Sequence, residues 1–442
     1  MEEIVLHPDR ELSEDALALG LLVTGRTTLD KFIWTKRSRQ FAEILQEFGL
    51  VVEERSAGVV LTGTGFSYRV PPLLHLPESD NAMVLLLGLA SKEDETVFTA
   101  TGSAAQIHRA KNFLTGIFGA KIENVSEAVP QTITFQFAKT LPVLKETREG
   151  QIPYLAKNAV LLNALLCGKN VECEERTPIR SGFVEMLSYF GAQIQVQITG
   201  MQEMSELERR IAKARGIKSE RRVKTVLSET KVLTSRDYFV PSDPTEAVAF
   251  AALSTLSPVF KGKKVELKNV LIASDRSGAF SALRRMGAKI EFGTRHERYG
   301  SAYANLYSTY EKRLSARRLG DDVLCTCIEE YPFLALAACT ADGESILRIP
   351  DSLALELRPR CEELARNLKQ TGASIGVYEE GLVVRGREEL DAGNFDAGND
   401  PVLELMFTVL SLFSQGESKI ENATQMEQEF PGISGQLKEL TK

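Results

Sequence analysis

The chain has 442 residues, of which 43% are hydrophobic and 26% charged, and its 53 Lys and Arg against 60 Asp and Glu give a net charge of −7. This length predicts about two or three domains, and the acidic balance argues against a protein whose whole surface binds nucleic acid. No apolar run approaches the roughly 20 residues of a membrane span, no secretory signal is recognisable, and six cysteines are too few for a disulfide scaffold. We therefore expect a cytoplasmic protein.

The predicted elements, taken in chain order, repeat a pair of helices. The first helix of each pair is apolar nearly all round, and such a helix has to be buried on every side. These apolar segments are ALALGLLVTG, NAMVLLLGLA, NAVLLNALLCG, EAVAFAALSTL, PFLALAACTADG and PVLELMFTVLSLF.

The second helix of each pair is amphipathic and ends at a glycine, which supplies the left-handed conformation that closes many helices. Five such helices end at Gly49, Gly119, Gly191, Gly287 and Gly372. Strand-like stretches such as VVEERSAGVVLTG and SIGVYEEGLVVRG follow these glycines. The sequence therefore predicts the same order of elements in each repeat unit: a strand, an apolar helix, a strand, an amphipathic helix and a pair of strands.

Six such units predict two lobes, because three buried helices wrapped by sheets make one domain. We expect an N-terminal lobe over residues 9–239 and a C-terminal lobe over 240–442, joined by residues 1–8, with the boundary near FVPSDP. Two stretches interrupt the repeats as expected inserts, a basic one over 201–235 and a Tyr- and Arg-rich one over 296–322. The ordinary explanation of the basic stretch is a solvated helix face. Either insert is a candidate docking element for a protein partner, whereas nucleic acid is disfavoured.

Four segments carry a family resemblance. VPSDPTEAVAFAAL is similar to the pattern V-P-G-D-x-S-S-A-A-F, SDRSGAFSALRRMGAKIE to P-T-R-T-G with its helix, IEEYPFLALAA to P-D-E-Y-P-x-L-A-x-A-A, and EFPGISGQL to S-F-P-x-F-x-x-x-L. In this order, the segments resemble the enolpyruvyl transferases, specifically the EPSP synthase (3-phosphoshikimate 1-carboxyvinyltransferase) family of the shikimate pathway. The resemblance covers almost the whole chain. It implies a two-lobed inside-out α/β barrel, in which three repeats per lobe place buried helices inside surrounding sheets.

The resemblance also implies a chemistry. The family moves an enolpyruvyl group from phosphoenolpyruvate to a sugar-acid hydroxyl, so its site holds two polyanions with Lys and Arg and moves protons with carboxylates. No cofactor and no metal is implied. Cys325 and Cys327 stand as a lone C-x-C, which is weak support for a zinc site.

Five residues match the family's site residues. Glu329 aligns with the catalytic aspartate and Arg10 with a lysine, so both are candidate catalytic residues; Ser13, Arg180 and Arg360 are candidate substrate-binding residues. Each has an ordinary alternative: Arg180 as a helix cap, Glu329 as a turn carboxylate, and Arg360 as part of a solvated helix face.

Many other site positions depart from the family pattern, and most departures remove a cation. The replacements are Asp15, Val84, Ala104, Gln106, Asn158, Glu356, Val402 and Gln428, with Glu78 and Asp80 added in the phosphoenolpyruvate loop. Each lost charged hydrogen bond removes on the order of 2 kcal/mol. Four or five such losses outweigh the total binding free energy of a micromolar ligand, about 8 kcal/mol.

Two hypotheses follow. The favoured one is an EPSP-synthase-like pseudoenzyme with lost or severely impaired enolpyruvyl transfer, which acts by binding and holds phosphoenolpyruvate or a shikimate-like ligand only weakly. The alternative is an active, divergent enolpyruvyl transferase that uses phosphoenolpyruvate and 3-phosphoshikimate or a related acceptor. The alternative needs replacement cations, for which Arg313, Arg317, Arg318 and the basic stretch near Arg221 are candidates.

Overall fold

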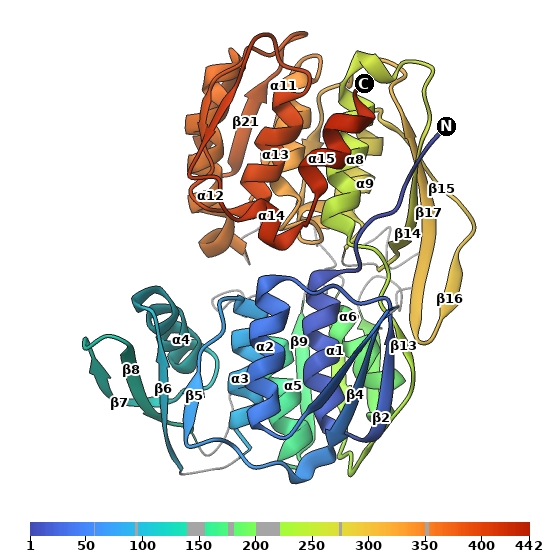
Figure 1. Ribbon diagram of the computed structural model, residues 1–442. Helices are drawn as coiled ribbons and strands as arrows, with labels where there is room; N and C mark the ends of the chain where they lie inside the picture. The colour runs from blue at the N-terminus through green and yellow to red at the C-terminus, as the bar shows by residue number, and fades with distance from the viewer. Residues whose placement is uncertain are drawn as a thin grey trace, which may run out of the picture. The chain divides into compact units, whose positions relative to one another are not determined.

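The computed structural model describes residues 1–442 except 57, 93–95, 139–154, 176–180, 200–221, 274–275 and 350–352. The chain divides into two compact units (Figure 1), each of which is described by itself. The first unit is Glu11–Phe239, and the second unit combines Met1–Arg10 with Val240–Lys442. None of the described helices combines the length and the apolar character that crossing a membrane requires.

The first unit has three apolar helices at its centre, as their all-round apolar sequences predict. They are α1 (Arg10–Leu22), α3 (Asp80–Ala90) and α5 (Ala156–Leu166), and all residues of α3 after Asp80 are buried. Three amphipathic helices accompany them: α2 (Lys36–Glu47), α4 (Ala104–Gly116) and α6 (Ser181–Tyr189).

Three sheets complete the first unit, and their strand orders are β12-β2-β4-β3 with β13 beside β2, β5-β6-β8-β7, and β10-β11-β9. The strands of the first sheet are β2 (Val23–Asp30), β3 (Val51–Arg55), β4 (Gly58–Thr64), β12 (Leu233–Thr234) and β13 (Tyr238–Phe239). Those of the other two are β5 (Leu73–His75), β6 (Val97–Gly102), β7 (Lys121–Ser126), β8 (Gln131–Gln136), β9 (Val171–Glu175), β10 (Ile194–Thr199) and β11 (Arg222–Leu227).

The second unit repeats this plan. Its buried helices α8 (Pro244–Leu256), α11 (Tyr331–Thr340) and α13 (Pro401–Ser411) contact one another (Figure 1). The other helices are α9 (Gly278–Arg285), α10 (Asp321–Leu324), α12 (Ala354–Leu368), α14 (Met426–Glu429) and α15 (Ile433–Leu440).

Three sheets also surround the second unit's core, with orders β1-β14-β17-β15 with β16 beside β17, β18-β19-β21-β20, and β22-β23. Their strands are β1 (Glu2–Ile4), β14 (Val265–Leu271), β15 (Lys289–Phe292), β16 (His296–Arg298), β17 (Ser301–Thr309), β18 (Arg318–Leu319), β19 (Glu344–Arg348), β20 (Ser374–Tyr378), β21 (Gly381–Arg385), β22 (Asn394–Asp396) and β23 (Lys419–Glu421). The strand β1 pairs in parallel with β14, so that Glu2 lies opposite Val265.

The glycines predicted to end the amphipathic helices have left-handed backbones. Their φ angles are 101° at Gly49, 57° at Gly119, 99° at Gly191, 101° at Gly287 and 79° at Gly372. These values confirm the predicted helix ends, since only glycine adopts such angles without steric cost.

The two expected inserts contain more regular repeat structure than the sequence indicated. Within 201–235, β11 pairs with both β10 and β9, and within 296–322, β17 is an interior strand of its sheet. Both strands bury alternate residues, such as Val223 and Thr225 in β11, but the polar residues at the partly exposed positions between them obscured this period of two. Residues 201–221 lie outside the described residues.

Candidate functional site

The buried helices of the second unit begin at acidic residues. Asp243 caps α8 by accepting hydrogen bonds from the backbone amides of Thr245 (2.8 Å) and Glu246 (3.3 Å). Asp400 caps α13 in the same way, and Glu330 precedes the first residue of α11. Carboxylates are favourable at these positions because unpaired amides and the helix dipole make a helix N-terminus positive.

Arg10 is bound to two of the chain's own carboxylates. Its Nε donates to Oδ2 of Asp243 (2.9 Å) and its Nη1 to Oε2 of Glu429 (3.3 Å), while its guanidinium lies 4.1 Å from the ring centroid of Phe430. Burial alone would lower the pKa of Arg10, but the charges of Asp243, Glu429 and Glu329 outweigh burial and raise it. Arg10 is therefore a permanent cation whose charge is already compensated.

Arg276 is held in the same cluster. Its Nη1 lies 3.4 Å from Oδ2 of Asp9, and its Nη2 lies 3.6 Å from Oε1 of Glu330. The Thr245 hydroxyl donates to Glu330 (2.6 Å), yet burial raises the pKa of Glu330 despite the attraction of Arg276. Arg276 lies in the quoted SDRSG segment, but its role in this cluster was not predicted from the sequence.

Arg360 binds Asp400, the carboxylate that caps the start of α13. Its Nη2 donates to Oδ2 of Asp400 (2.6 Å) and its Nη1 to the carbonyl of Ile328 (3.1 Å). Burial alone would lower the pKa of Arg360, but the charges of Asp400 and Glu329 raise it. Burial alone would raise the pKa of Asp400, but Arg360 and the capping amides keep it below the usual range. The pair thus stabilises the start of α13.

Three of the five predicted site residues come together in the second unit. Glu329 interacts electrostatically with both Arg10 and Arg360, so these three residues lie in one cluster at the beginnings of the buried helices. Ser13 is fully buried on α1 of the first unit. Arg180 lies outside the described residues. We call the group of Arg10, Arg276, Arg360 and their carboxylates the arginine cluster.

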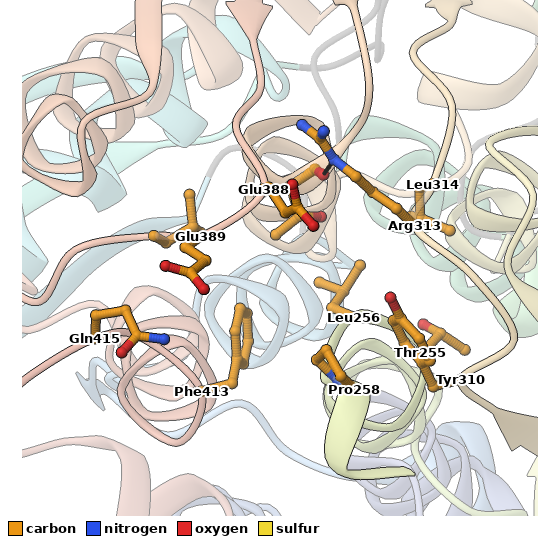
Figure 2. A pocket seen from close by; sticks show the side chains of 12 residues that line it. Thr255, Leu256, Pro258, Tyr310, Arg313, Leu314, Glu388, Glu389, Phe413 and Gln415 are labelled. Atoms are coloured by element: carbon orange, nitrogen blue, oxygen red, sulfur yellow. Dashed lines mark hydrogen bonds between the residues drawn. The ribbon is translucent and has the colours of Figure 1, made fainter. Parts of the chain in front are cut away.

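A cavity of about 180 Å³ lies at the other ends of the second unit's buried helices. Figure 2 shows Leu256, Arg313 and Phe413 among the side chains that line it. Arg313 donates from Nε to the carbonyl of Thr340 (2.8 Å) and from Nη2 to that of Ala341 (3.1 Å) and so caps the end of α11. The ten residues of α11 separate this cavity from the arginine cluster by about 15 Å.

The described residues contain no group of three or more His, Cys, Asp or Glu side chains suited to hold a metal ion. Cys325 and Cys327 are buried free thiols, and burial raises the pKa of Cys327 well above its ordinary value. A protonated thiol is a poor metal ligand.

Comparison of the sequence with models of protein families shows to which family the chain belongs. The model of EPSP synthase (3-phosphoshikimate 1-carboxyvinyltransferase) matches residues 2–437. The chain belongs to the EPSP synthase family. Its sequence is 24% identical over 441 residues to the 3-phosphoshikimate 1-carboxyvinyltransferase of Oceanobacillus iheyensis, covering 98% of this chain and 95% of that protein. It is 25% identical over 448 residues to that of Bacillus subtilis, covering 100% and 97%.

Solved structures show the same fold. The EPSP synthase of Acinetobacter baumannii aligns with a TM-score of 0.75 at 20% identity over 99% of this chain and 95% of that chain. The enolpyruvyl transferase NikO of Streptomyces tendae aligns with a TM-score of 0.67 at 14% identity over 100% and 94%. The predicted two-lobed α/β fold of the enolpyruvyl transferases is therefore confirmed.

In the first unit, three residues that the sequence aligns with cations of the family pattern, Asp15, Val84 and Gln106, have structural contacts. Val84 is 1% exposed in the core. Gln106 forms a capping box with Ser103 at the start of α4. Asp15 is buried and accepts a hydrogen bond from Nδ2 of Asn81 (3.1 Å). Asn158 aligns with a serine of the family pattern rather than with a cation; it is 1% exposed, and neither polar atom of its side chain has a hydrogen-bond partner among the described residues.

The two acidic residues added to the phosphoenolpyruvate loop of the family pattern are also paired. Glu78 accepts from Nζ of Lys36 (3.1 Å), and Asp80 lies 3.3 Å from Nε of Arg109. Both pairs are partly exposed. Glu78 and Asp80 thus neutralise two surface cations of the first unit, Lys36 and Arg109, which would otherwise attract an anionic ligand.

Proposed function

We propose that this member of the EPSP synthase family is a pseudoenzyme that acts by binding rather than by enolpyruvyl transfer. The observation that carries the proposal is the arginine cluster, in which Arg10, Arg276 and Arg360 are each bound to carboxylates of the chain itself. A polyanionic substrate needs cations whose charge is available to it.

Freeing these arginines for a ligand is costly. Asp243 and Glu429 are 2% and 3% exposed in their pairs with Arg10. Breaking a buried ion pair on one side costs about 3 to 5 kcal/mol, because the other charge stays buried without compensation. That cost is a large share of the roughly 8 kcal/mol of binding free energy at a micromolar dissociation constant.

One observation favours the alternative, a divergent but active enolpyruvyl transferase. Glu329 lies in the electrostatic range of Arg10 and Arg360, so a carboxylate for proton transfer and two cations are still adjacent. Against this alternative, Arg313 caps α11 at the far end of the core, and Arg317 donates to the carbonyl of Arg285 (2.9 Å). Nη2 of Arg318 lies 3.8 Å from Oε2 of Glu380. These three suggested replacement cations therefore have other partners, whereas Arg221 lies outside the described residues.

The test is calorimetric titration of the folded protein with 3-phosphoshikimate, then with phosphoenolpyruvate added, and a phosphate-release assay on the same sample. We expect no binding tighter than about 100 µM and no phosphate release. A curated relative, such as the Bacillus subtilis protein, serves as the positive control in the same buffer. Tight binding with turnover would establish the divergent enzyme and overturn the pseudoenzyme proposal.

The proposed binding role includes a protein partner at the stretches 201–235 and 296–322 and a cytoplasmic location. The location is supported by free thiols at all six cysteines, since disulfides are rare in reducing compartments. Affinity capture from a cell extract with the intact chain, compared with a chain in which residues 296–300 are shortened to a Gly-containing turn, tests the second stretch. Capture of the same proteins by both chains would argue against a partner there.

A further inference from the structure

The edge strand β10 of the first unit has an unusual sequence. It pairs antiparallel with β11 along its whole length, from Ile194 opposite Leu227 to Thr199 opposite Arg222. Among the strands that the structure describes, β10 has no second neighbour. Val196 is 54% exposed and Ile198 is 38% exposed. Within the described part of the chain, the strand therefore presents an unpaired backbone edge beside exposed apolar side chains.

The equivalent edge strands of the other repeats are protected. Each follows an amphipathic helix and lies at the end of its sheet, and these strands are β3, β7, β15 and β20. Charges lie along the first three, at Glu53, Glu54 and Arg55, at Lys121 and Glu123, and at Lys289 and Glu291. The strand β7 is also bulged, and β20 contains Gly376 and runs directly into Glu379 and Glu380. Charges and bulges at an edge prevent pairing with another chain.

The sequence of β10, Ile-Gln-Val-Gln-Ile-Thr, contains no charge. Its first five residues, Ile194 to Ile198, also read the same in both directions around Val196. In an antiparallel pair around a two-fold axis at this residue, Ile194 would lie opposite the partner's Ile198, and Val196 opposite the partner's Val196. Gln195 would lie opposite the partner's Gln197. Apolar side chains would meet on one face and amides on the other, whereas a shift by one residue would oppose Val196 to a glutamine.

We propose that β10 joins two copies of this chain into a symmetric dimer by antiparallel pairing centred on Val196, so that the sheet β10-β11-β9 continues into the partner copy. A two-fold interface uses the same surface patch on both copies, so the patch has to be complementary to itself. The palindromic sequence of residues 194–198 has this property. The backbone edge supplies the hydrogen bonds and the alternating side chains supply the register. The proposal concerns a surface outside the arginine cluster and holds whether or not the chain is catalytic.

The dimer is expected to be weak. A single strand pair buries less than the roughly 1,200 Å² at which stable interfaces begin. We therefore expect a monomer–dimer equilibrium with a dissociation constant of about 10 to 100 µM. Sedimentation velocity of the full chain across this concentration range measures it.

The decisive variant is Val196→Lys, because a residue on the axis faces its own copy and two added ammonium groups would repel each other. We expect the dissociation constant to rise at least about tenfold. The matched control is Val51→Lys on β3, since Val51 is 53% exposed on an equivalent edge strand. This control should dimerise like the unchanged chain. Thermal melting establishes that both variants are folded.

A second measurement does not depend on affinity. Oxidation of Val196→Cys should give an intermolecular disulfide, because directly opposed residues of antiparallel strands place their Cβ atoms about 4.5 to 5.5 Å apart. Oxidation of Val51→Cys and of the unchanged chain, in which Cys167 alone among the cysteines is not buried, sets the background. A monomeric chain at all concentrations, equal loss of dimer in both lysine variants, or equal cross-linking of both cysteine variants would overturn the proposal.

Discussion

At the scale of single residues, Arg10 shows that a retained cation is not necessarily a retained ligand site. The sequence predicts its charge, but its partners Asp243 and Glu429 lie 233 and 419 positions away along the chain. Only the fold brings these residues together, so no sequence pattern could predict that the charge is compensated. Arg276 was missed for the same reason, because its partners lie in other helices and loops.

The buried ion pair of Lys157 and Glu175 should be sensitive to the loss of one partner. The two atoms Nζ and Oε2 lie 2.8 Å apart, and both side chains are 4% exposed. The change Glu175→Gln is expected to lower the free energy of unfolding by about 3 to 5 kcal/mol, because a buried ammonium loses its counter-charge. The fluorescence of Trp34, the single tryptophan of the chain, reports urea unfolding of the first unit.

The control for this prediction is Glu54→Gln in the exposed pair with Arg39, whose side chains are 53% and 51% exposed. A change of about 1 kcal/mol or less is expected there. Equal effects at Glu175 and Glu54 would show that burial does not determine the importance of these pairs.

The contact of His7 with Glu246 should make the stability of the folded protein depend on pH. Its hydrogen bond with Glu246 (3.1 Å) raises the pKa of His7 above 6.5, although burial opposes the shift. The hydrogen bond therefore stabilises the folded protein fully below pH 6.5, the pKa of this histidine in the unfolded chain. The stabilisation is lost as the pH rises through the pKa of His7 in the folded protein. In His7→Gln, the decline of the melting temperature above pH 6.5 should therefore be smaller. His75→Gln, at an exposed position, should keep the decline of the unchanged chain.

At the scale of helices and strands, much of the fold could be predicted. Apolar helices such as α3 have no polar face, and burial on all sides is their only stable environment. The glycines at helix ends are predictable because their positive φ angles have a steric cost for other residues. The strands β11 and β17 were taken for inserts because their partly exposed positions carry polar residues such as Lys224 and Tyr307, and a period of two is weak over short segments.

Glycine also sets the distance between a strand and a buried helix. A Cβ atom at Gly63, in β4, would overlap the carbonyl oxygens of Gly20 and Val23, and one at Gly386, after β21, would overlap those of Ala338 and Ala341. These glycines end the quoted stretches VVEERSAGVVLTG and SIGVYEEGLVVRG. In these two repeats, the strand pair therefore approaches the end of its buried helix at backbone distance.

The change Gly63→Ala is accordingly expected to destabilise the first unit by about 1 to 3 kcal/mol through overpacking. Gly116→Ala is the matched control, because nothing lies within 4 Å of an added Cβ there, and removing backbone freedom should leave stability unchanged or raise it by up to about 1 kcal/mol. Urea titrations followed by Trp34 fluorescence measure both. A neutral Gly63→Ala would show that the strand can move away from α1.

At the scale of the whole molecule, ligand linkage tests without an activity assay whether the chain binds the substrates of the EPSP synthase family. A ligand present at 1,000 times its dissociation constant stabilises a folded protein by about 4 kcal/mol. We expect about 1 mM phosphoenolpyruvate with 3-phosphoshikimate to raise the melting temperature no more than the same ionic strength of sulfate does. A rise of several degrees beyond the sulfate control would contradict the weak binding that the pseudoenzyme proposal expects.

The pairing of β1 with β14 has a consequence for biosynthesis. Glu2 lies opposite Val265, so the first unit, Glu11–Phe239, is translated between the two partners. At about 5 to 20 residues per second, the β1 segment waits roughly 13 to 50 seconds for its neighbour to be made. During this interval a complete first unit can fold on the ribosome, while the segment that precedes it has no sheet to join.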